Sequence, residues 1–290
     1  MTQTPSSPTL VAVQGATGQQ GGAVAAALLE RGVRVRGLTR DPASAAGVAL
    51  AGAGAEVVAA EPTDADSLAE AFAGASHVFA MTTPAAGGPA GEVVQGEAMV
   101  TAAERAGVSF VCFSSVGGAE RHTGVPHFDS KRRVEERLQA SGLGSVILRP
   151  VFFMDNLAGT GVEDGTVVVR LPLPADVPLQ MVAVQDIGRI AAAVLLEPGR
   201  VEGAVEIAGD ERTGEQVAEV FGRAAGLPAR YEALPLQVLG EDEDMRSMFD
   251  WFTRLPAYRA DFALTRELDP GLLDLPGWLA ATGWSRSAGG

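Results

Sequence analysis

The 290-residue sequence carries 22 Lys and Arg against 36 Asp and Glu, which gives a formal net charge of −14 at pH 7. Binding to nucleic-acid phosphates requires clustered cations, so this acidic balance argues against nucleic acid as a direct partner. A single cysteine, Cys112, excludes an intrachain disulfide and fits a reducing compartment. The three histidines are scattered, so no metal-binding cluster is expected.

Two further features of composition concern location. Residues 1–8 are polar and proline-rich and lack the apolar core of a signal peptide, so we expect a flexible tail there. No stretch reaches the roughly 18 apolar residues that a membrane span needs. We therefore expect a cytoplasmic protein, monomeric or homodimeric, with no membrane partner.

A glycine-rich turn follows the first apolar run of the chain, Leu10–Val13. Gly15, Gly18 and Gly21 stand at three-residue spacing, and a helix-like segment runs from Gly21 to Arg31. Gly15 permits a tight turn, Gly18 lets the backbone approach a pyrophosphate, and Gly21 lets the helix pack close to the strand. The helix N-terminus offers N–H groups and positive dipole to an anion. The order strand, glycine turn, helix predicts a dinucleotide-binding βαβ unit, with the G-x-x-G-x-x-G spacing of the short-chain dehydrogenase superfamily.

Strand and helix signals alternate through residues 9–150, which we interpret as the cofactor-binding domain. The predicted strands are Leu10–Val13, Val33–Leu38, Glu56–Ala59, His77–Met81, Phe110–Phe113 and Ser145–Leu148. The predicted helices are Gly21–Arg31, Ala43–Ala51, Ser67–Phe72, Glu92–Ala106 and Ser130–Ala140. This alternation predicts an α/β fold of the Rossmann type, with a doubly wound parallel sheet whose strand C-termini meet at one ligand-binding edge.

After Pro150 the alternation stops. We expect residues 151–290 to form a smaller C-terminal α/β lobe for a substrate or partner, partly interleaved with the sheet. Its predicted elements are a strand Val167–Leu171, a helix Ile187–Leu196 with Asp186 as N-cap, a strand Val205–Ala208, a helix ending at Ala225 and opened by a capping box of Thr213 and Gln216, a helix Glu241–Arg254 and a final segment Leu279–Trp284.

The end of the second predicted strand decides between NAD and NADP. An acidic residue there holds the ribose 2′-hydroxyl of NAD, whereas the 2′-phosphate of NADP requires a cation. Here the strand runs into Thr39 and Arg40, which can donate a hydroxyl hydrogen bond and clamp a phosphate. Asp41 precedes Pro42 and is interpreted as the cap of the next helix. This pattern favours NADP(H); the alternative is that Arg40 is a solvated loop charge.

Active short-chain dehydrogenases carry Tyr-x-x-x-Lys on one helix, with a Ser about thirteen residues upstream, so that the Lys ammonium assists proton transfer by the phenol. The matching residues here are His127, Lys131 and Ser114, so His replaces the Tyr. Lys131 is expected to hold the nicotinamide ribose, and His127 is a candidate proton donor. The alternatives are a solvated charge at Lys131 and a plain helix-start residue at His127.

Several segments together resemble the NmrA-like family of atypical short-chain dehydrogenases. They include GATGQQGGAVAAALL, RGLTRDP, PHFDSKRRVEERL, LRPVFFMDNL and AGDERTGEQVAEVF, so the likeness spans nearly the whole chain. The resemblance implies a Rossmann domain with a smaller C-terminal domain and NADP(H) as cofactor. Many members lack the catalytic Tyr. Several report the NADPH/NADP⁺ ratio to a regulatory protein partner, and others reduce quinones or dyes with NADPH.

The resemblance also implies a set of cofactor-binding residues. They are Gly15, Thr17, Gly18, Gln20 and Gly21 in the glycine loop, Arg40 at the 2′-phosphate, Glu61 and Pro62 beside the adenine, Thr82 and Thr83 beside the ribose, Lys131 as the retained Lys, and Phe153 and Asn156 over the nicotinamide. Other members often have Asp-Gln where Glu61 and Pro62 stand.

Two functions remain open. The missing Tyr beside an intact cofactor site favours a redox-state sensor or regulator. The alternative is an NADPH-dependent reductase of a quinone-like or other activated acceptor, in which water or His127 supplies a proton. The reductase alternative is supported by a group of apolar residues that could line a substrate pocket. Ordinary packing in the core also explains the presence of each of these residues. These residues are Phe152, Phe153, Met154, Phe249, Trp251 and Phe252.

Overall fold

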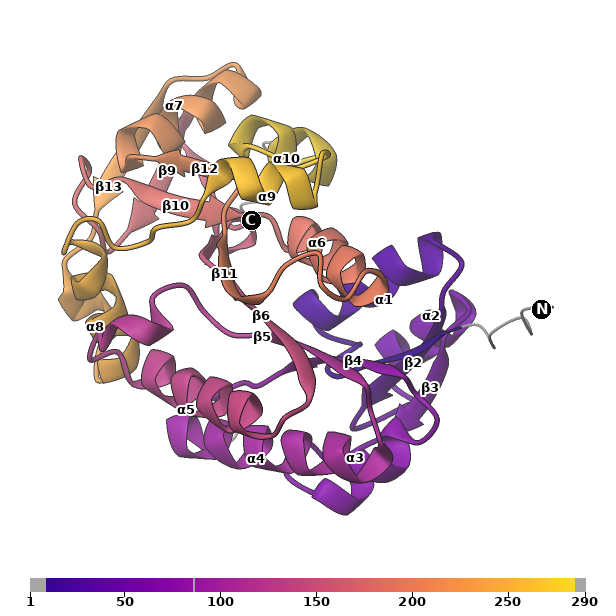
Figure 1. Ribbon diagram of the computed structural model, residues 1–290. Coiled ribbons are helices and arrows are strands. Elements are labelled where there is room, and N and C mark those ends of the chain that lie inside the picture. Colours follow the sequence, from indigo (N-terminus) through magenta and orange to yellow (C-terminus); the bar gives the residue numbers. More distant parts are fainter. Residues whose placement is uncertain (1–8, 86, 285–290) are drawn as a thin grey trace. The chain divides into compact units, whose positions relative to one another are not determined.

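Strands and helices alternate through the first half of the chain in the computed structural model, which describes residues 9–85 and 87–284 (Figure 1). The expected tail, residues 1–8, lies outside the described residues. The elements are β1 (Leu10–Val13), α1 (Gln19–Glu30), β2 (Arg34–Thr39), α2 (Ala45–Gly52), β3 (Glu56–Ala59), α3 (Ala65–Phe72), β4 (His77–Met81), α4 (Gly88–Ala106), β5 (Phe110–Ser114), the 3-10 helix η1 (Ala119–Arg121), α5 (Pro126–Ala140) and β6 (Gly144–Pro150).

These strands form a seven-stranded sheet in the order β11-β6-β5-β4-β1-β2-β3, in which β11 is Gly203–Ile207. β1 pairs in parallel with both β2 and β4, and the pairs β2–β3, β4–β5 and β5–β6 are parallel too. The chain order reverses between β1 and β4, which is where doubly wound sheets bind their ligands. The predicted Rossmann-type α/β fold is confirmed.

The central strands of the seven-stranded sheet are buried because helices cover both of its faces. Every residue of β1 and of β5 is buried, as expected when helices cover both sides of a parallel sheet. On the face covered by α3, α4 and α5, the core includes Phe72, Met99, Phe113 and Leu138, all fully buried. Cys112 is also fully buried, and burial raises the pKa of its thiol. It is therefore a packing residue rather than a nucleophile.

The helix starts correct the sequence prediction in two ways. The N-cap of α2 is Ser44, whose hydroxyl accepts a 3.2 Å hydrogen bond from the helix backbone, and not Asp41. The Asp41 carboxylate instead accepts from the Ala43 N–H at 2.9 Å. Helices α4 and α5 begin at Gly88 and Pro126, one turn before their predicted starts. Proline in a first turn explains the difference, because its missing N–H costs nothing there.

The second half forms two three-stranded sheets, β12-β10-β7 and β13-β9-β8, with further helices. Its elements are β7 (Phe152–Phe153), η2 (Met154–Leu157), β8 (Gly161–Glu163), β9 (Thr166–Leu171), β10 (Leu179–Val182), α6 (Val184–Leu196), β12 (Asp210–Arg212), α7 (Gly214–Ala225), β13 (Ala229–Ala233), η3 (Leu236–Leu239), α8 (Glu243–Phe252), α9 (Phe262–Leu268) and α10 (Leu275–Thr282).

Two predictions for this half have opposite outcomes. The capping box of Thr213 and Gln216 is present at the start of α7. Asp186 is not the N-cap of α6, because the helix begins two residues earlier. Its fully buried carboxylate accepts from the Leu273 N–H at 2.9 Å, so it holds a distant segment of the chain. The Val184 N–H at the start of α6 donates instead to Asp155, at 2.8 Å.

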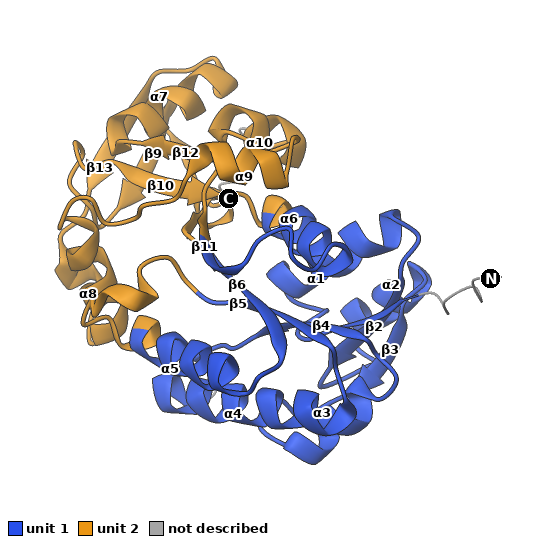
Figure 2. Cartoon of the chain, viewed as in Figure 1, with its two compact units in different colours: residues 1–115, 129–149, 187–205 blue, residues 116–128, 150–186, 206–290 orange. Residues whose placement is uncertain are grey.

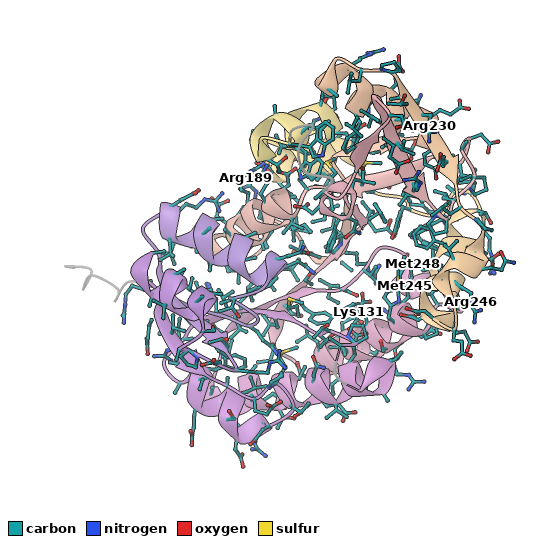
Figure 3. All side chains as sticks on the ribbon, turned by 180° about the vertical axis from the view of Figure 1, so that it is seen from behind. Lys131, Arg189, Arg230, Met245, Arg246 and Met248 are labelled. Atoms are coloured by element: carbon teal, nitrogen blue, oxygen red, sulfur yellow. The ribbon has the colours of Figure 1, made fainter. Side chains whose placement is uncertain are left out.

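The chain divides into two compact units (Figure 2). The first unit comprises residues 1–115, 129–149 and 187–205, and the second comprises 116–128, 150–186 and 206–290. Each unit is therefore assembled from three segments, so no single cut near residue 150 separates them. The second unit carries exposed charges, such as Arg230 on β13 (Figure 3). Within the described part of the chain, no helix combines the length and the apolar character that crossing a membrane requires.

Candidate dinucleotide site

The glycine turn after β1 has the backbone geometry of an anion cradle. Gly15 has a φ of +66°, a conformation that side chains disfavour, and its carbonyl accepts from the Gly18 N–H at 2.9 Å. Gly18 is the N-cap of α1 and, lacking a side chain, makes no capping hydrogen bond to the helix. A Cβ on Gly21 would lie 2.3 Å from the Gly15 carbonyl oxygen, so only glycine allows this approach. The first N–H groups of α1 are thus left for a ligand, and a pyrophosphate fits this cradle.

The end of β2 presents a cation. The Thr39 hydroxyl lies 3.2 Å from that of Thr17 and accepts from the Asp41 N–H at 3.3 Å. Arg40 is exposed, and no described residue forms a hydrogen bond or ion pair with its guanidinium. The Asp41 carboxylate is already used by its own turn. The edge therefore offers a free guanidinium and a hydroxyl, which suit a phosphate better than a ribose hydroxyl.

The residues after β3 form a local turn. The Glu61 N–H donates to the Ser67 hydroxyl at 3.0 Å, and the Glu61 carboxylate accepts from the Thr63 hydroxyl at 3.0 Å. Glu61 is exposed, and Pro62 beside it is half-buried. Their role beside an adenine stays a prediction.

The residues after β4 are fixed by α4. The Thr83 N–H donates to Gln95 Oε1 at 3.1 Å, and Gln95 Nε2 donates back to the Thr83 carbonyl at 2.9 Å. Gln95 is buried, whereas Thr83 is exposed. The sequence gives no signal for Gln95, because a single Gln on a mostly apolar helix has no distinctive spacing.

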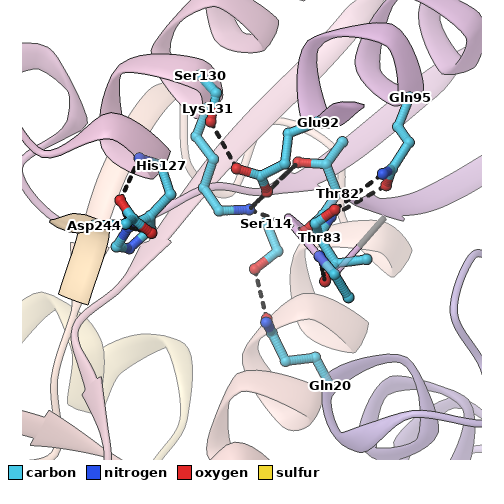
Figure 4. Close-up of polar contacts among 11 residues, drawn as sticks. Gln20, Thr82, Thr83, Glu92, Gln95, Ser114, His127, Ser130, Lys131 and Asp244 are labelled. Atoms are coloured by element: carbon cyan, nitrogen blue, oxygen red, sulfur yellow. Dashed lines mark hydrogen bonds and ion pairs between the residues drawn. The ribbon is translucent and has the colours of Figure 1, made fainter. Parts of the chain in front are cut away.

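The alternative interpretation of Lys131 as a solvated charge is wrong, because its side chain does not point into solvent. Its Nζ lies 2.9 Å from Glu92 Oε1 and donates to the Thr82 carbonyl at 3.0 Å and to the Thr82 hydroxyl at 3.3 Å (Figure 4). The Glu92 carboxylate is fully buried and also accepts from the Ser130 hydroxyl at 2.6 Å. The structure thus brings together the predicted residues Thr82 and Lys131 and adds Glu92, which sequence reasoning missed.

Ser114 and Gln20 are joined by a direct hydrogen bond. The Ser114 hydroxyl donates to Gln20 Oε1 at 2.7 Å. In the register of β4 and β5, Ser114 stands opposite Met81, the residue before Thr82. Ser114, Thr82 and Lys131 therefore gather at the carboxyl ends of β4 and β5, next to the first turn of α1.

His127 forms an ion-pair contact inside the second unit. Its Nδ1 lies 2.8 Å from the Asp244 carboxylate, which also accepts from the His127 backbone N–H at 2.9 Å. Burial alone would raise the pKa of Asp244, but the hydrogen bonds and charge of His127 outweigh it and hold that pKa below its usual value. This arrangement orients the imidazole. Asp244 lies 117 residues from His127, so no local sequence pattern connects them.

Neither tyrosine takes the place of the missing phenol donor. The Tyr231 hydroxyl donates to the Leu173 carbonyl at 2.7 Å, and burial raises its pKa to about 12. Tyr258 is buried against Gly117 and Trp251, and burial raises its pKa still further. Both phenols are therefore held as packing groups.

The residues predicted to cover the nicotinamide belong to the second unit. Phe153 is half-buried in β7, and Asn156 is exposed in η2; their cofactor role stays a prediction. The candidate pocket aromatics contact one another: Phe252 packs against Phe152, Phe249 and Trp251. All four are buried, so core packing accounts for them. The described residues contain no group of three or more His, Cys, Asp or Glu able to hold a metal ion.

Comparisons with known proteins place this site in a family context. The chain matches the NmrA-like family over residues 7–272. It is 30% identical over 290 aligned residues to an NmrA-like family domain-containing oxidoreductase, lnaB, of Aspergillus flavus, covering 86% of this chain and 85% of that protein. It is also 30% identical over 144 residues to an NAD(P)H azoreductase of Xenophilus azovorans, a match that spans 48% of this chain and only 49% of that enzyme.

Two solved structures have the same fold. One is the NADPH-dependent quinone oxidoreductase QOR2 of Escherichia coli, complexed with NADPH, at a TM-score of 0.79 and 23% identity over 94% of this chain and 99% of that one. The other is NmrA, a negative transcriptional regulator in complex with NADP, at a TM-score of 0.81 and 20% identity over 93% and 94%. Together with the match over residues 7–272, these results show that the chain belongs to the NmrA-like family.

Proposed function

We propose that this protein binds NADP(H) at the edge formed by β1, β2 and β4, and prefers it to NAD(H). The observation that carries the proposal is the combination of a glycine cradle whose N-cap has no side chain with the guanidinium of Arg40, to which no described residue forms a hydrogen bond or ion pair. The cradle would hold the pyrophosphate, Arg40 and Thr39 the 2′-phosphate, and Lys131 the nicotinamide ribose. When bound, the nicotinamide supplies a hydride.

We further propose that the protein reduces an activated acceptor, such as a quinone or an azo compound. Two observations support this over a purely regulatory role. The relatives at 30% identity carry the names oxidoreductase and azoreductase. In addition, the Asp244 contact orients His127, one helical turn before Lys131 on α5, as a proton donor requires. A conjugated acceptor needs a well-placed hydride but no phenol.

A regulator that senses the NADPH/NADP⁺ ratio is the second candidate. Its support is that the groups matching the dehydrogenase Ser and Lys are engaged within the protein: Ser114 by Gln20, and Lys131 by Glu92 and Thr82. The solved structure of the regulator NmrA, which holds NADP, shares the fold.

One pair of measurements separates these roles. Calorimetric titration with NADP⁺, NADPH, NAD⁺ and NADH tests the binding proposal, and equal affinities for the phosphorylated and unphosphorylated forms would contradict it. NADPH oxidation is then followed over a panel of quinones, enones and azo dyes. Turnover with any of these acceptors supports the reductase, whereas tight NADPH binding without oxidation supports the regulator.

A further inference from the structure

Glu92 is a buried carboxylate next to Lys131, and none of the predicted cofactor contacts explains its presence. Glu92 lies on α4 and has no exposed side-chain surface. Three donors surround it: the Lys131 ammonium at 2.9 Å and the Thr82 hydroxyl at 3.1 Å on Oε1, and the Ser130 hydroxyl at 2.6 Å on Oε2. An ionised carboxylate without such partners would be costly to bury, so this arrangement depends on all three.

The same contacts determine where the Lys131 ammonium lies. A lysine side chain is a flexible four-carbon chain, and without fixed partners its ammonium samples many positions. Here Nζ is held by a carboxylate from α4 and by two oxygens of Thr82 at the end of β4, while its own backbone is on α5. Three elements thus converge on one ammonium, whose side chain is only 12% exposed.

We propose that Glu92 is the positioning residue that holds the Lys131 ammonium in place for the ribose hydroxyls of the dinucleotide. This inference rests on the proposed NADP(H) site. The longest of the three Nζ contacts, at 3.3 Å to the Thr82 hydroxyl, is the one most readily exchanged for a ribose hydroxyl. Glu92 and the Thr82 carbonyl would keep the ammonium in place during that exchange. Glu92 therefore acts on the cofactor only through Lys131.

The chain offers a matched control one turn further along α5. Glu135 is also a fully buried carboxylate, paired with Arg149 at 2.7 Å and Arg132 at 3.1 Å. Its loss likewise removes a buried carboxylate from its cationic partners but leaves the contacts of Lys131 and Thr82 untouched. Comparing Glu92→Gln with Glu135→Gln separates an effect on the cofactor from an effect on stability alone.

The experiment is a double-mutant cycle on NADPH affinity, measured by calorimetry well below the unfolding temperature. Lys131→Met is expected to weaken NADPH binding roughly 10-fold or more, the effect of a lost charged hydrogen bond. Glu92→Gln is expected to weaken it about 5- to 10-fold, through loss of the fixed ammonium. In the double variant, Glu92→Gln should add nothing to the effect of Lys131→Met. Glu135→Gln should lower the unfolding midpoint without changing NADPH affinity.

Other outcomes overturn the inference in recognisable ways. An unchanged affinity in Glu92→Gln, or effects of Glu92→Gln and Lys131→Met that simply add, would mean that Glu92 does not act through Lys131. If Glu92→Gln does not fold, Ser130→Ala replaces it in the cycle: it removes the hydroxyl that holds Glu92 Oε2 at 2.6 Å, and should weaken NADPH only while Lys131 is present. A wild-type protein that does not bind NADPH refutes the proposed function itself, and the inference with it.

Discussion

The Ser114 hydroxyl donates a 2.7 Å hydrogen bond to Gln20 Oε1, which joins the end of β5 to the first turn of α1 across 94 residues of sequence. The position matches the catalytic serine of active short-chain dehydrogenases, yet here the hydroxyl has a protein partner. This bond fixes the side chain of Gln20 beside the glycine turn that we propose holds the pyrophosphate. The serine thus supports the architecture of the site.

Replacing this serine tests that role. Ser114→Ala should lower the free energy of unfolding by about 1 kcal/mol, the typical net value of one hydrogen bond, and leave the rate of NADPH oxidation unchanged. The control is Ser115→Ala, because the buried Ser115 hydroxyl has no hydrogen-bond partner among the described residues and should cost nothing. Urea unfolding and steady-state kinetics measure both. A fall in rate of about 10²-fold for Ser114→Ala would restore a catalytic role.

The cofactor preference depends on Arg40. Arg40→Ala should weaken NADP(H) binding by about 2 kcal/mol or more, roughly 30-fold, because a charged hydrogen bond to the 2′-phosphate is lost. NAD(H) binding should be nearly unchanged. Arg34→Ala at the start of the same strand is the control, since Arg34 is exposed at the opposite end of β2. Calorimetry that finds equal losses for both dinucleotides would disprove the assignment of Arg40.

Two glycines of the turn should respond differently to a side chain. A Cβ on Gly18 would meet only the Gly15 carbonyl, at 3.3 Å, and its φ of −98° suits any residue. Gly18→Val should therefore still fold, at a small cost in stability, and lose NADPH binding, because the side chain blocks the pyrophosphate. Gly21→Ala would place Cβ 2.3 Å from the same carbonyl and should lower the thermal unfolding midpoint as well. Native NADPH affinity in Gly18→Val would show that the pyrophosphate binds elsewhere.

The sequence predicts most of the first half, because its signals are local. The alternation of apolar runs and helical segments is sufficient for a parallel sheet, and strands β1, β3 and β4 begin and end where predicted. Helix starts are less accurate, since a proline in the first turn is permitted and extends α4 and α5 by one turn. The short strands of the second half, such as β7 with two residues, have too few residues for a periodicity to appear.

The candidate site likewise contains residues that the sequence predicts and residues that it does not. The glycine spacing and the position of Arg40 at the end of a strand can be predicted from the sequence, because the role of these residues depends on their neighbours in the chain. The contacts of Glu92 with Lys131 and of Asp244 with His127 cannot be predicted in this way, because only folding brings each pair together. Glu92 is 39 residues from Lys131, and both are ordinary charged residues on helices. Only burial in the folded chain, which is complete for Glu92 and partial for Asp244, distinguishes these two carboxylates from solvated charges.

The pair of His127 and Asp244 should make stability depend on acid pH. The pKa of Asp244 is lower in the folded protein than its usual value, so the carboxylate stabilises the fold above its unfolded pKa. That contribution should disappear as the pH falls below about 4, through the folded pKa. The difference in unfolding free energy between wild type and Asp244→Asn should thus be present near pH 5 and shrink towards zero in stronger acid. A difference that stays constant with pH would contradict this account.

The reactions open to this site depend on the groups available for proton transfer. The protein should oxidise no simple secondary alcohol and reduce no simple ketone, because Tyr258 is buried, the Tyr231 hydroxyl is bonded to a backbone carbonyl, and His127 stands at the phenol position. Its expected reaction is NADPH-dependent reduction of a quinone or azo acceptor. His127→Phe should leave NADPH affinity unchanged and slow that reduction by roughly 10²-fold, near the low end of general-acid effects, because water can replace the imidazole as donor. Asp244→Asn should slow it less, since it only releases the orientation of the imidazole.

Three results distinguish the remaining possibilities when these variants are measured together. Turnover that is insensitive to His127→Phe means that hydride transfer needs proximity alone and that water supplies the proton. No NADPH oxidation with any acceptor, together with tight NADPH binding, means that the site serves regulation. Rapid oxidation of simple secondary alcohols by the wild type would refute the site altogether, because active short-chain dehydrogenases use a Tyr phenol for that reaction at the position where this chain has His127 beside Asp244.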